Sequence, residues 1–228
     1  MKQTLLAECA RLDIPLSEAQ AEQFCQFGNA LIEQNKVMNL TAITDPGAVA
    51  KLHFADCLAL LKIHDLKNKT LIDVGCGAGF PGVPLKLGEP TLRLTLLDSL
   101  QKRVNWLRQT METMGIEAEC VASRAEDFGH RESFDVATSR AVARLNILAE
   151  LCLPFVKVGG VFLAMKAAAA EEELQEAKKA IAVLGGRPEQ VAEYEIEGAP
   201  RRVLVIRKVK PTPAQYPRRF AKIKQNPL

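Results

Sequence analysis

A glycine-rich bend directly after a hydrophobic strand is the feature that most restricts what this chain can fold into. The segment reads Leu71-Ile-Asp-Val-Gly-Cys-Gly-Ala-Gly-Phe-Pro-Gly82. Glycines allow a tight turn and a close approach of the backbone to a ligand, and a helix that follows them directs the positive end of its dipole at the same place. The segment therefore predicts a strand, a ligand-binding bend and a helix at the edge of an α/β sheet.

Short apolar runs and helical stretches alternate on both sides of this bend, which predicts a mostly parallel sheet with crossover helices. The strands are expected at Thr70 to Val74, Leu92 to Leu97, Glu119 to Ala122, Phe134 to Ser139, Gly160 to Met165, Val191 to Ile196 and Arg202 to Lys208. The helices between them are expected at Gln101 to Met114, Leu145 to Val156 and Ala167 to Leu184. The last two strands should form a hairpin-like pair around Gly198 and Pro200.

Three regions follow from these patterns. Residues 1–66 are expected to form a helical cap, in which Ser17 begins a helix reaching about Gln34 and Asp45-Pro46 begins another reaching about Ile63. Residues 67–210 are the main α/β domain. Residues 211–228 contain four prolines and are expected to be a flexible basic tail without regular structure.

Composition places the chain among ordinary globular proteins. Hydrophobic residues make up 48% and charged residues 25% of its 228 residues. No run of about 18 apolar residues occurs, and Glu8 and Asp13 interrupt the N-terminus where a signal peptide would be apolar, so we expect a cytoplasmic protein without membrane contact. The six cysteines form no CxxC pair and the three histidines are separate from them, so no metal site is expected.

Two kinds of nucleotide ligand suit the bend. Gly77-x-Gly79-x-x-Gly82 with Asp98 downstream matches the dinucleotide pattern, which keeps a nicotinamide enzyme open as an interpretation. However, Asp73 stands two residues before Gly75, and a carboxylate beside the bend would repel a pyrophosphate but attract a cationic amino acid group. Asp73, Gly75, Gly77 and Gly79 are therefore the predicted site for S-adenosylmethionine. This stretch is similar to the glycine motif of Rossmann-like methyltransferases, and that resemblance implies that Asp98 holds the ribose hydroxyls.

The sequence lacks the motifs that are typical of two kinds of methyl acceptor, exocyclic amines and pyrimidine carbon. The fourth predicted strand ends in Ala137-Thr-Ser-Arg-Ala141, not in the N/D-P-P-Y/F segment that usually serves exocyclic amines, and no Pro-Cys dipeptide occurs for methylation of pyrimidine carbon. Guanine N7 carries an exposed lone pair and needs no general base. Catalysis would then rest on positioning the nucleophile against the methyl group.

The chain resembles, over nearly its whole length, the RsmG (GidB) family of bacterial methyltransferases that act on guanine N7 in 16S ribosomal RNA. The resemblance rests on Asn35-Lys-Val-Met-Asn-Leu-Thr41, Asp45-Pro46, His53-Phe-Ala-Asp56, Ile72 to Pro84, Leu97-Asp-Ser99, Lys102-Arg103, Ser123 to Phe128, Ser139-Arg-Ala141 and Met165-Lys166. It implies a sheet of about seven strands with the last one antiparallel, and a target guanine in the 530 loop. It also implies cofactor contacts at Gly75, Phe80, Ala125, Glu126 and Arg140.

Positive charge is concentrated near the C-terminus. Residues 198–228 contain nine Lys or Arg and no Asp or Glu, so the remainder of the chain carries 3 − 9 = −6. Such a distribution favours contact with a polyanion, and Tyr216 and Phe220 offer rings for base stacking. The predicted RNA contacts are Lys102, Arg103, Arg201, Arg202, Arg218, Arg219, Lys222 and Lys224.

The catalytic residues are not fixed by the sequence. The candidates are His53 and Asp56, which lie three residues apart on one predicted helix face, and Lys166 at the end of the fifth strand. A 16S RNA or small-subunit substrate is preferred, while a small-molecule methyltransferase and a non-catalytic RNA-binding assembly factor stay open. A monomer is the default expectation.

Overall fold

The computed structural model describes residues 1–140, 143–166 and 170–228. Within them lies one seven-stranded sheet in the order β3-β2-β1-β4-β5-β7-β6. The first five strands are parallel, and β7 runs antiparallel to both β5 and β6. The strands are β1 (Thr70–Val74), β2 (Arg93–Asp98), β3 (Glu119–Ala122), β4 (Phe134–Arg140), β5 (Val156–Lys166), β6 (Gly186–Ile196) and β7 (Ala199–Lys208).

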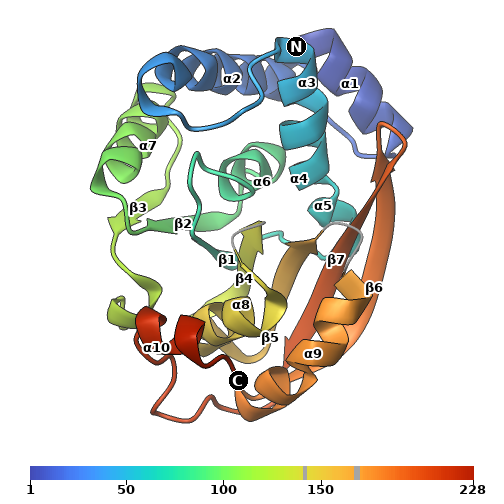
Figure 1. Cartoon of the computed structure of the whole chain (residues 1–228). Helices are drawn as coiled ribbons and strands as arrows, with labels where there is room; N and C mark the ends of the chain where they lie inside the picture. Colours follow the sequence, from blue (N-terminus) through green and yellow to red (C-terminus); the bar gives the residue numbers. More distant parts are fainter. Residues whose placement is uncertain (141–142, 167–169) are drawn as a thin grey trace.

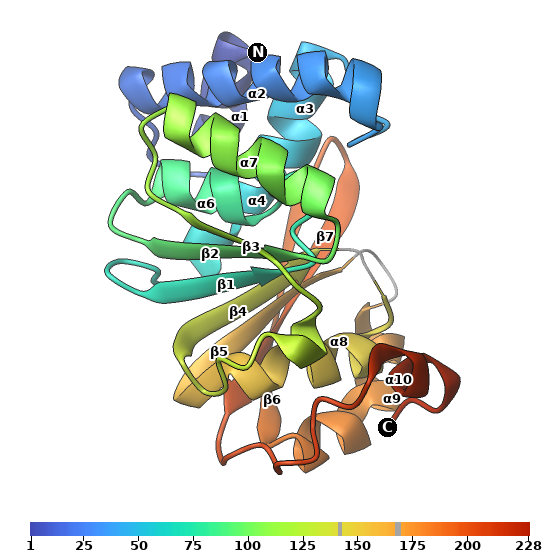
Figure 2. The ribbon, with the colours of Figure 1, turned by 90° about the vertical axis from the view of Figure 1, so that its left-hand side faces the viewer.

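Helices cover both faces of this sheet (Figures 1 and 2). One face carries α6 (Gly82–Gly88), α7 (Gln101–Thr113) and, above them, the N-terminal helices. The other carries α8 (Leu145–Cys152), α9 (Ala170–Val183) and α10 (Phe220–Gln225). The N-terminal helices are α1 (Lys2–Arg11), α2 (Glu18–Met38), α3 (Pro46–Val49), a π-helical turn η1 (Ala50–Ala55), α4 (Asp56–Leu58) and α5 (Leu60–Ile63).

Because side chains alternate between the two faces of the sheet, the protein has two separate hydrophobic cores. Successive side chains of a strand point to opposite faces, so Leu71 packs under the N-terminal helices while Ile72 packs against α8 and α9. The same division separates Val203 from Leu204 in β7. Because both faces are covered, the strands β1, β2 and β4 are almost entirely buried, as is usual for parallel sheets, whereas the edge strand β6 exposes many of its residues.

The predicted caps of the N-terminal helices are confirmed. Ser17 accepts a hydrogen bond from Gln20 N at 3.2 Å and forms a capping box, and Asp45 Oδ1 accepts one from Ala48 N at 2.8 Å. Helix α2 continues to Met38, beyond the predicted end near Gln34, and ends where Asn39 adopts a left-handed φ of 49°. The helix predicted from Asp45 to Ile63 is present, with the π turn inside it.

Several boundaries differ from the sequence prediction. Helix α8 ends at Cys152, not Val156, because Pro154 cannot continue an α-helix and instead lies in a 3₁₀ turn, η3 (Leu153–Phe155). Strand β6 begins five residues early and includes Pro188, which an edge strand with a register shift tolerates. The predicted start of the helix at 167–184 lies outside the described residues.

The prediction that the final stretch has no regular structure is wrong. Residues 220–225 form helix α10, and the Ile223 side chain is fully buried. The four prolines restrict the path of the segment, but it is held against the domain by side chains distant in sequence, which local composition does not reveal. The division into residues 1–66, 67–210 and 211–228 stays a prediction.

Candidate active site

The glycine bend follows β1 and turns back toward β2. Gly75 N and Cys76 N both donate to Leu97 O, at 2.8 and 3.1 Å. Gly79 has a φ of 93°, and a Cβ there would lie 2.7 Å from Val83 and 2.9 Å from Leu107. Any side chain at Gly79 would therefore separate the bend from α6 and α7, which explains the glycine physically.

Asp73 lies directly beneath this bend. Its side chain is fully buried, Oδ2 accepts a hydrogen bond from Gly82 N at 2.8 Å, and Oδ1 has no partner among the described residues. Burial raises the pKa of Asp73 to about 7, although the Gly82 hydrogen bond and the charge of Arg140 oppose the shift. An unpaired buried carboxylate oxygen is costly, so burial favours the neutral, protonated form of Asp73.

Asp98 ends β2 on the opposite side of the bend. Oδ2 accepts from Gly77 N at 2.9 Å and Oδ1 accepts from Leu100 N at 2.8 Å. Each carboxylate oxygen keeps a second lone pair, so Asp98 can hold the bend and still accept from a ribose hydroxyl.

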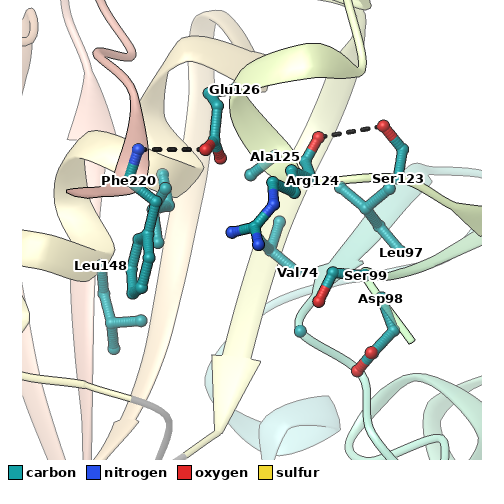
Figure 3. Close-up of a pocket in the computed structure, with 12 residues that line it drawn as sticks. Val74, Leu97, Asp98, Ser99, Ser123, Arg124, Ala125, Glu126, Leu148 and Phe220 are labelled. Carbon is teal, nitrogen blue, oxygen red and sulfur yellow. Dashed lines mark hydrogen bonds between the residues drawn. The ribbon is translucent and has the colours of Figure 1, made fainter. Parts of the chain in front are cut away.

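A cleft opens beside Asp98, at the carboxyl ends of β1, β2 and β3 (Figure 3). Ala125 and Glu126 line it from the 3₁₀ turn η2 (Ala125–Asp127), and their contact with the cofactor stays a prediction. Sequence reasoning missed other lining residues, and it gave Phe220 an RNA-stacking role instead. These additional residues are Val74, Leu97, Ser99, Ser123, Arg124, Leu148, Leu151 and Phe220.

Arg140 marks a second pocket of about 650 Å³ at the ends of β4 and β5. Its guanidinium carbon lies 4.6 Å from the centroid of the Phe80 ring, and Nη1 lies 3.6 Å from Asp56 Oδ2. Phe80 is almost fully buried, so the residue predicted to contact the cofactor supports the arginine by a cation–π contact. The pocket size is within the usual range for small-ligand sites.

His53 lies on the buried side of this pocket. Nη2 of Arg140 lies 3.3 Å from Nδ1 of His53, and Nε2 lies 2.8 Å from Thr41 Oγ1. Burial lowers the pKa of His53 to about 4, and the charge of Arg140 adds to the effect. The ring is therefore neutral at physiological pH. Nδ1 lies between the Arg140 guanidinium and Leu52 O, which is 3.2 Å away, so its role as acceptor or donor depends on the tautomer.

Asp56 faces the same pocket from α4. Tyr194 donates a hydrogen bond of 2.9 Å to Oδ1, and Arg201 Nε lies 3.5 Å from the same oxygen. Burial raises the pKa of Asp56, while Arg140, Tyr194 and Arg201 oppose the rise. The structure thus brings the two predicted helix residues His53 and Asp56 together with Arg140 from β4.

Lys166 also lines the second pocket, but its charge is already engaged. Nζ donates to Ala143 O at 2.6 Å and lies 2.7 Å from Glu173 Oε2. The lysine side chain is only 6% exposed. These contacts favour a structural role at the end of β5 over a free contact with phosphate.

The predicted RNA contacts fall into two groups. Within the described part of the chain, Arg201, Arg202, Arg218 and Arg219 pair with Asp56, Glu193, Glu150 and Asp127. In the same residues, no acidic partner faces the side chains of Lys102 and Arg103 at the start of α7, or of Lys222 and Lys224 on α10. The second group stays a prediction for phosphate contact.

Across residues 1–140, 143–166 and 170–228, no three His, Cys, Asp or Glu side chains come together in a way that could hold a metal ion. Over the same ranges, every helix is too short or too polar to cross a membrane.

The fold and the glycine bend define a Rossmann-like methyltransferase that uses S-adenosylmethionine. Solved structures share this fold: a SAM-dependent methyltransferase from Aquifex aeolicus aligns with a TM-score of 0.55 and 18% identity, over 78% of this chain and 97% of that one. A geranyl diphosphate methyltransferase in complex with SAM aligns with a TM-score of 0.54 and 14% identity, over 68% and 85% of the two chains. Likeness at this identity concerns the fold.

Sequence comparison gives the family. The family model described as GidB, rRNA small subunit methyltransferase G, matches residues 20–204. A ribosomal RNA small subunit methyltransferase G from Clostridium botulinum is 42% identical over 98% of this chain and 97% of its own length. The protein of that name from Pelotomaculum thermopropionicum is 44% identical over 100% and 99%. The chain belongs to this family, as the sequence motifs predicted.

Proposed function

We propose that this chain transfers the methyl group of S-adenosylmethionine to N7 of a guanine in 16S ribosomal RNA, in the 530 loop of the small subunit. The observation that carries the proposal is the adjacency of two pockets at one edge of the sheet. The Asp98 cleft lies at the end of β1, the Arg140 pocket lies at the end of β4, and these strands are neighbours. Ser139 Oγ donates to Val74 O at 2.8 Å between them.

The first pocket suits the cofactor. Asp98 would accept from the ribose, Ala125 and Glu126 would border the adenine, and the unpaired Oδ1 of Asp73 would receive the positive charge of the amino group. Arg140 is the nearby cation suited to the cofactor's carboxylate. When bound, the cofactor supplies a methyl group activated by a sulfonium.

The second pocket suits the target base. Guanine presents N1–H and N2–H₂ donors on one edge. Oδ2 of Asp56 faces the pocket with the Arg140 guanidinium, 3.6 Å away, as its one partner among the described residues, so it keeps lone pairs for such donors. A carboxylate that accepts hydrogen bonds from N1–H and N2–H₂ would leave N7, on the opposite edge of the base, exposed. No base is needed at N7, which agrees with a neutral His53 held by Thr41 and Arg140.

The test is methyl transfer from labelled cofactor to purified small subunits or naked 16S RNA, followed by mapping N7-methylguanine through chain cleavage. Label at one guanine of the 530 loop is expected. Methyl transfer to a small molecule, without dependence on salt, would support a small-molecule methyltransferase instead. Binding of RNA without methyl transfer to either substrate would support a non-catalytic assembly factor.

Two accompanying proposals concern where and in what form the chain works. Ribosomal RNA as substrate implies that it acts in the cytoplasm, where subunits are assembled. We also propose that it acts as a monomer, which is the default expectation from the sequence. A measured mass near twice 25.0 kDa by light scattering would contradict the second proposal.

A further inference from the structure

The C-terminal segment, residues 211–228, is held to the domain by hydrogen bonds before it reaches the cofactor cleft. The buried Lys208 Nζ donates to Leu153 O and to Thr212 Oγ1, both at 2.6 Å. Thr212 in turn donates to Leu184 O at 2.6 Å, and Arg131 donates to Thr212 O at 2.9 Å and to Tyr216 O. The proline-rich segment is thus held along its path by the side chains of Lys208 and Arg131 and by the backbone carbonyl of Leu184.

A buried ion pair then fixes the segment to α8. Glu150 is fully buried and accepts three hydrogen bonds from Arg218. Arg218 N and Nε donate to Oε1 at 2.9 and 2.8 Å, and Nη2 donates to Oε2 at 2.6 Å. Without the arginine, α8 would carry an unpaired buried carboxylate, which is strongly unfavourable. The same helix contributes Leu148 and Leu151 to the cleft. The position of the segment and the shape of the cleft are therefore linked.

This fastening brings Phe220 to the cleft. Its backbone N donates to Glu126 Oε1 at 3.0 Å, and the preceding Arg219 lies 2.6 Å from Asp127 Oδ1, so two consecutive residues dock on the turn η2. Figure 3 shows the ring of Phe220 beside Leu148, across the cleft from Asp98 and Ser99. One side of the cleft is thus polar, and the other is an apolar wall to which the C-terminal segment contributes.

We propose that the C-terminal segment completes the cofactor site, with Phe220 contacting the adenine and the Arg218–Glu150 pair positioning it. An aromatic ring and two leucines opposite the ribose-binding carboxylate exclude water from one face of a purine and offer it a stacking surface. Glu126, which borders the adenine, is shared with Phe220 N. The inference rests on the proposed use of S-adenosylmethionine and replaces the RNA-stacking role that the sequence suggested for Phe220.

Calorimetry on the full chain tests the inference, with S-adenosylhomocysteine and 5′-methylthioadenosine as probes. Phe220→Ala should weaken both by about tenfold, because both carry the adenine. Phe220→Trp should bind within about threefold of the unchanged protein, and its added emission should be quenched by either probe. Gln225→Ala is the matched control, since Gln225 is exposed on the same helix, and it should change neither affinity.

A second variant addresses the positioning pair. Arg218→Gln removes the positive charge that pairs with Glu150, and Arg218 itself does not line the cleft. This variant should weaken both probes and increase proteolysis of the segment after residue 210. Far-ultraviolet circular dichroism should confirm that each variant is folded.

The outcomes separate this inference from the proposed function. If the unchanged protein binds neither probe, the proposed function fails. If it binds both and folded Phe220→Ala binds them equally well, the inference is overturned while the proposed function stands. Unchanged cofactor affinity with weakened binding to 16S RNA would also overturn it, because the ring would then serve the RNA.

Discussion

The guanidinium of Arg140 stacks on Phe80, 4.6 Å from the ring centroid, while the same group lies 3.6 Å from Asp56 on the helix opposite. An arginine held in this way has one orientation, between the cofactor bend and the second pocket. Residues that lie 60 positions apart in sequence, Phe80 and Arg140, are thus joined at the ends of adjacent strands.

Arg140→Ala is expected to weaken binding of S-adenosylhomocysteine by at least about tenfold, because the cation proposed to bind the carboxylate of this compound is lost. Arg140→Lys should recover little, since an ammonium cannot stack on Phe80 and donate in a planar fork. Calorimetry measures the change. Lys36→Ala, which removes an exposed cation on α2, is the control, and equal affinity in a folded Arg140→Ala protein would refute the assignment.

Asp73 predicts a specific dependence of stability on pH. Its pKa is about 7 in the folded protein and near 3.8 when unfolded, so between these values the folded state holds a proton that the unfolded state has released. The contribution of Asp73 to the free energy of unfolding should therefore fall from about pH 4 to about pH 7 and stay level above. Urea unfolding of the ligand-free protein and Asp73→Asn at several pH values measures this, and identical slopes would contradict it.

The same carboxylate should make ligand affinity depend on pH with the opposite sign. Ionised Asp73 attracts an ammonium, so S-adenosylhomocysteine should bind more tightly as pH rises through 7. The compound 5′-methylthioadenosine lacks the amino acid group and should show no such rise. A rise for both compounds would assign the effect to another residue.

Local sequence predicted the site only where local structure creates it. Asp73 lies near the end of β1 and Asp98 ends β2. Because these two strands are parallel neighbours, their pairing alone brings both carboxylates to the bend. Phe220 and the Arg218–Glu150 pair were beyond such reasoning, because 68 residues separate Arg218 from Glu150 and neither position has a periodic pattern. Composition suggested a loose tail there, whereas specific long-range hydrogen bonds determine its path.

Asp56→Asn should separate binding of the base from binding of the cofactor. Asparagine keeps the volume but replaces one acceptor oxygen by a donor, which would face the N1–H and N2–H₂ donors of guanine. We expect kcat/KM on small subunits to fall by about a hundredfold, equivalent to ~3 kcal/mol, with cofactor affinity nearly unchanged. Steady-state kinetics and calorimetry measure the two quantities, and a parallel loss of cofactor affinity would place Asp56 in the cofactor site instead.

Four basic side chains near the mouth of the cofactor cleft should account for part of the affinity for RNA. Lys102 and Arg103 begin α7 directly after the Asp98 strand, and Lys222 and Lys224 follow Phe220 on α10, so the two pairs flank the cleft from either side. Since no carboxylate neutralises them within the described residues, each can displace a counterion from a phosphate.

Replacing all four by glutamine should reduce the slope of log K against log salt by up to about 4 × 0.7 for single-stranded RNA. Binding of 16S RNA measured from low to physiological salt gives the slope, and cofactor affinity should stay the same. The matched control replaces Lys67 and Lys69, which lie before β1 at the opposite end of the strands, and it should leave the slope unchanged. An equal loss of slope per removed charge in both proteins would mean that the RNA responds to total charge and not to these positions.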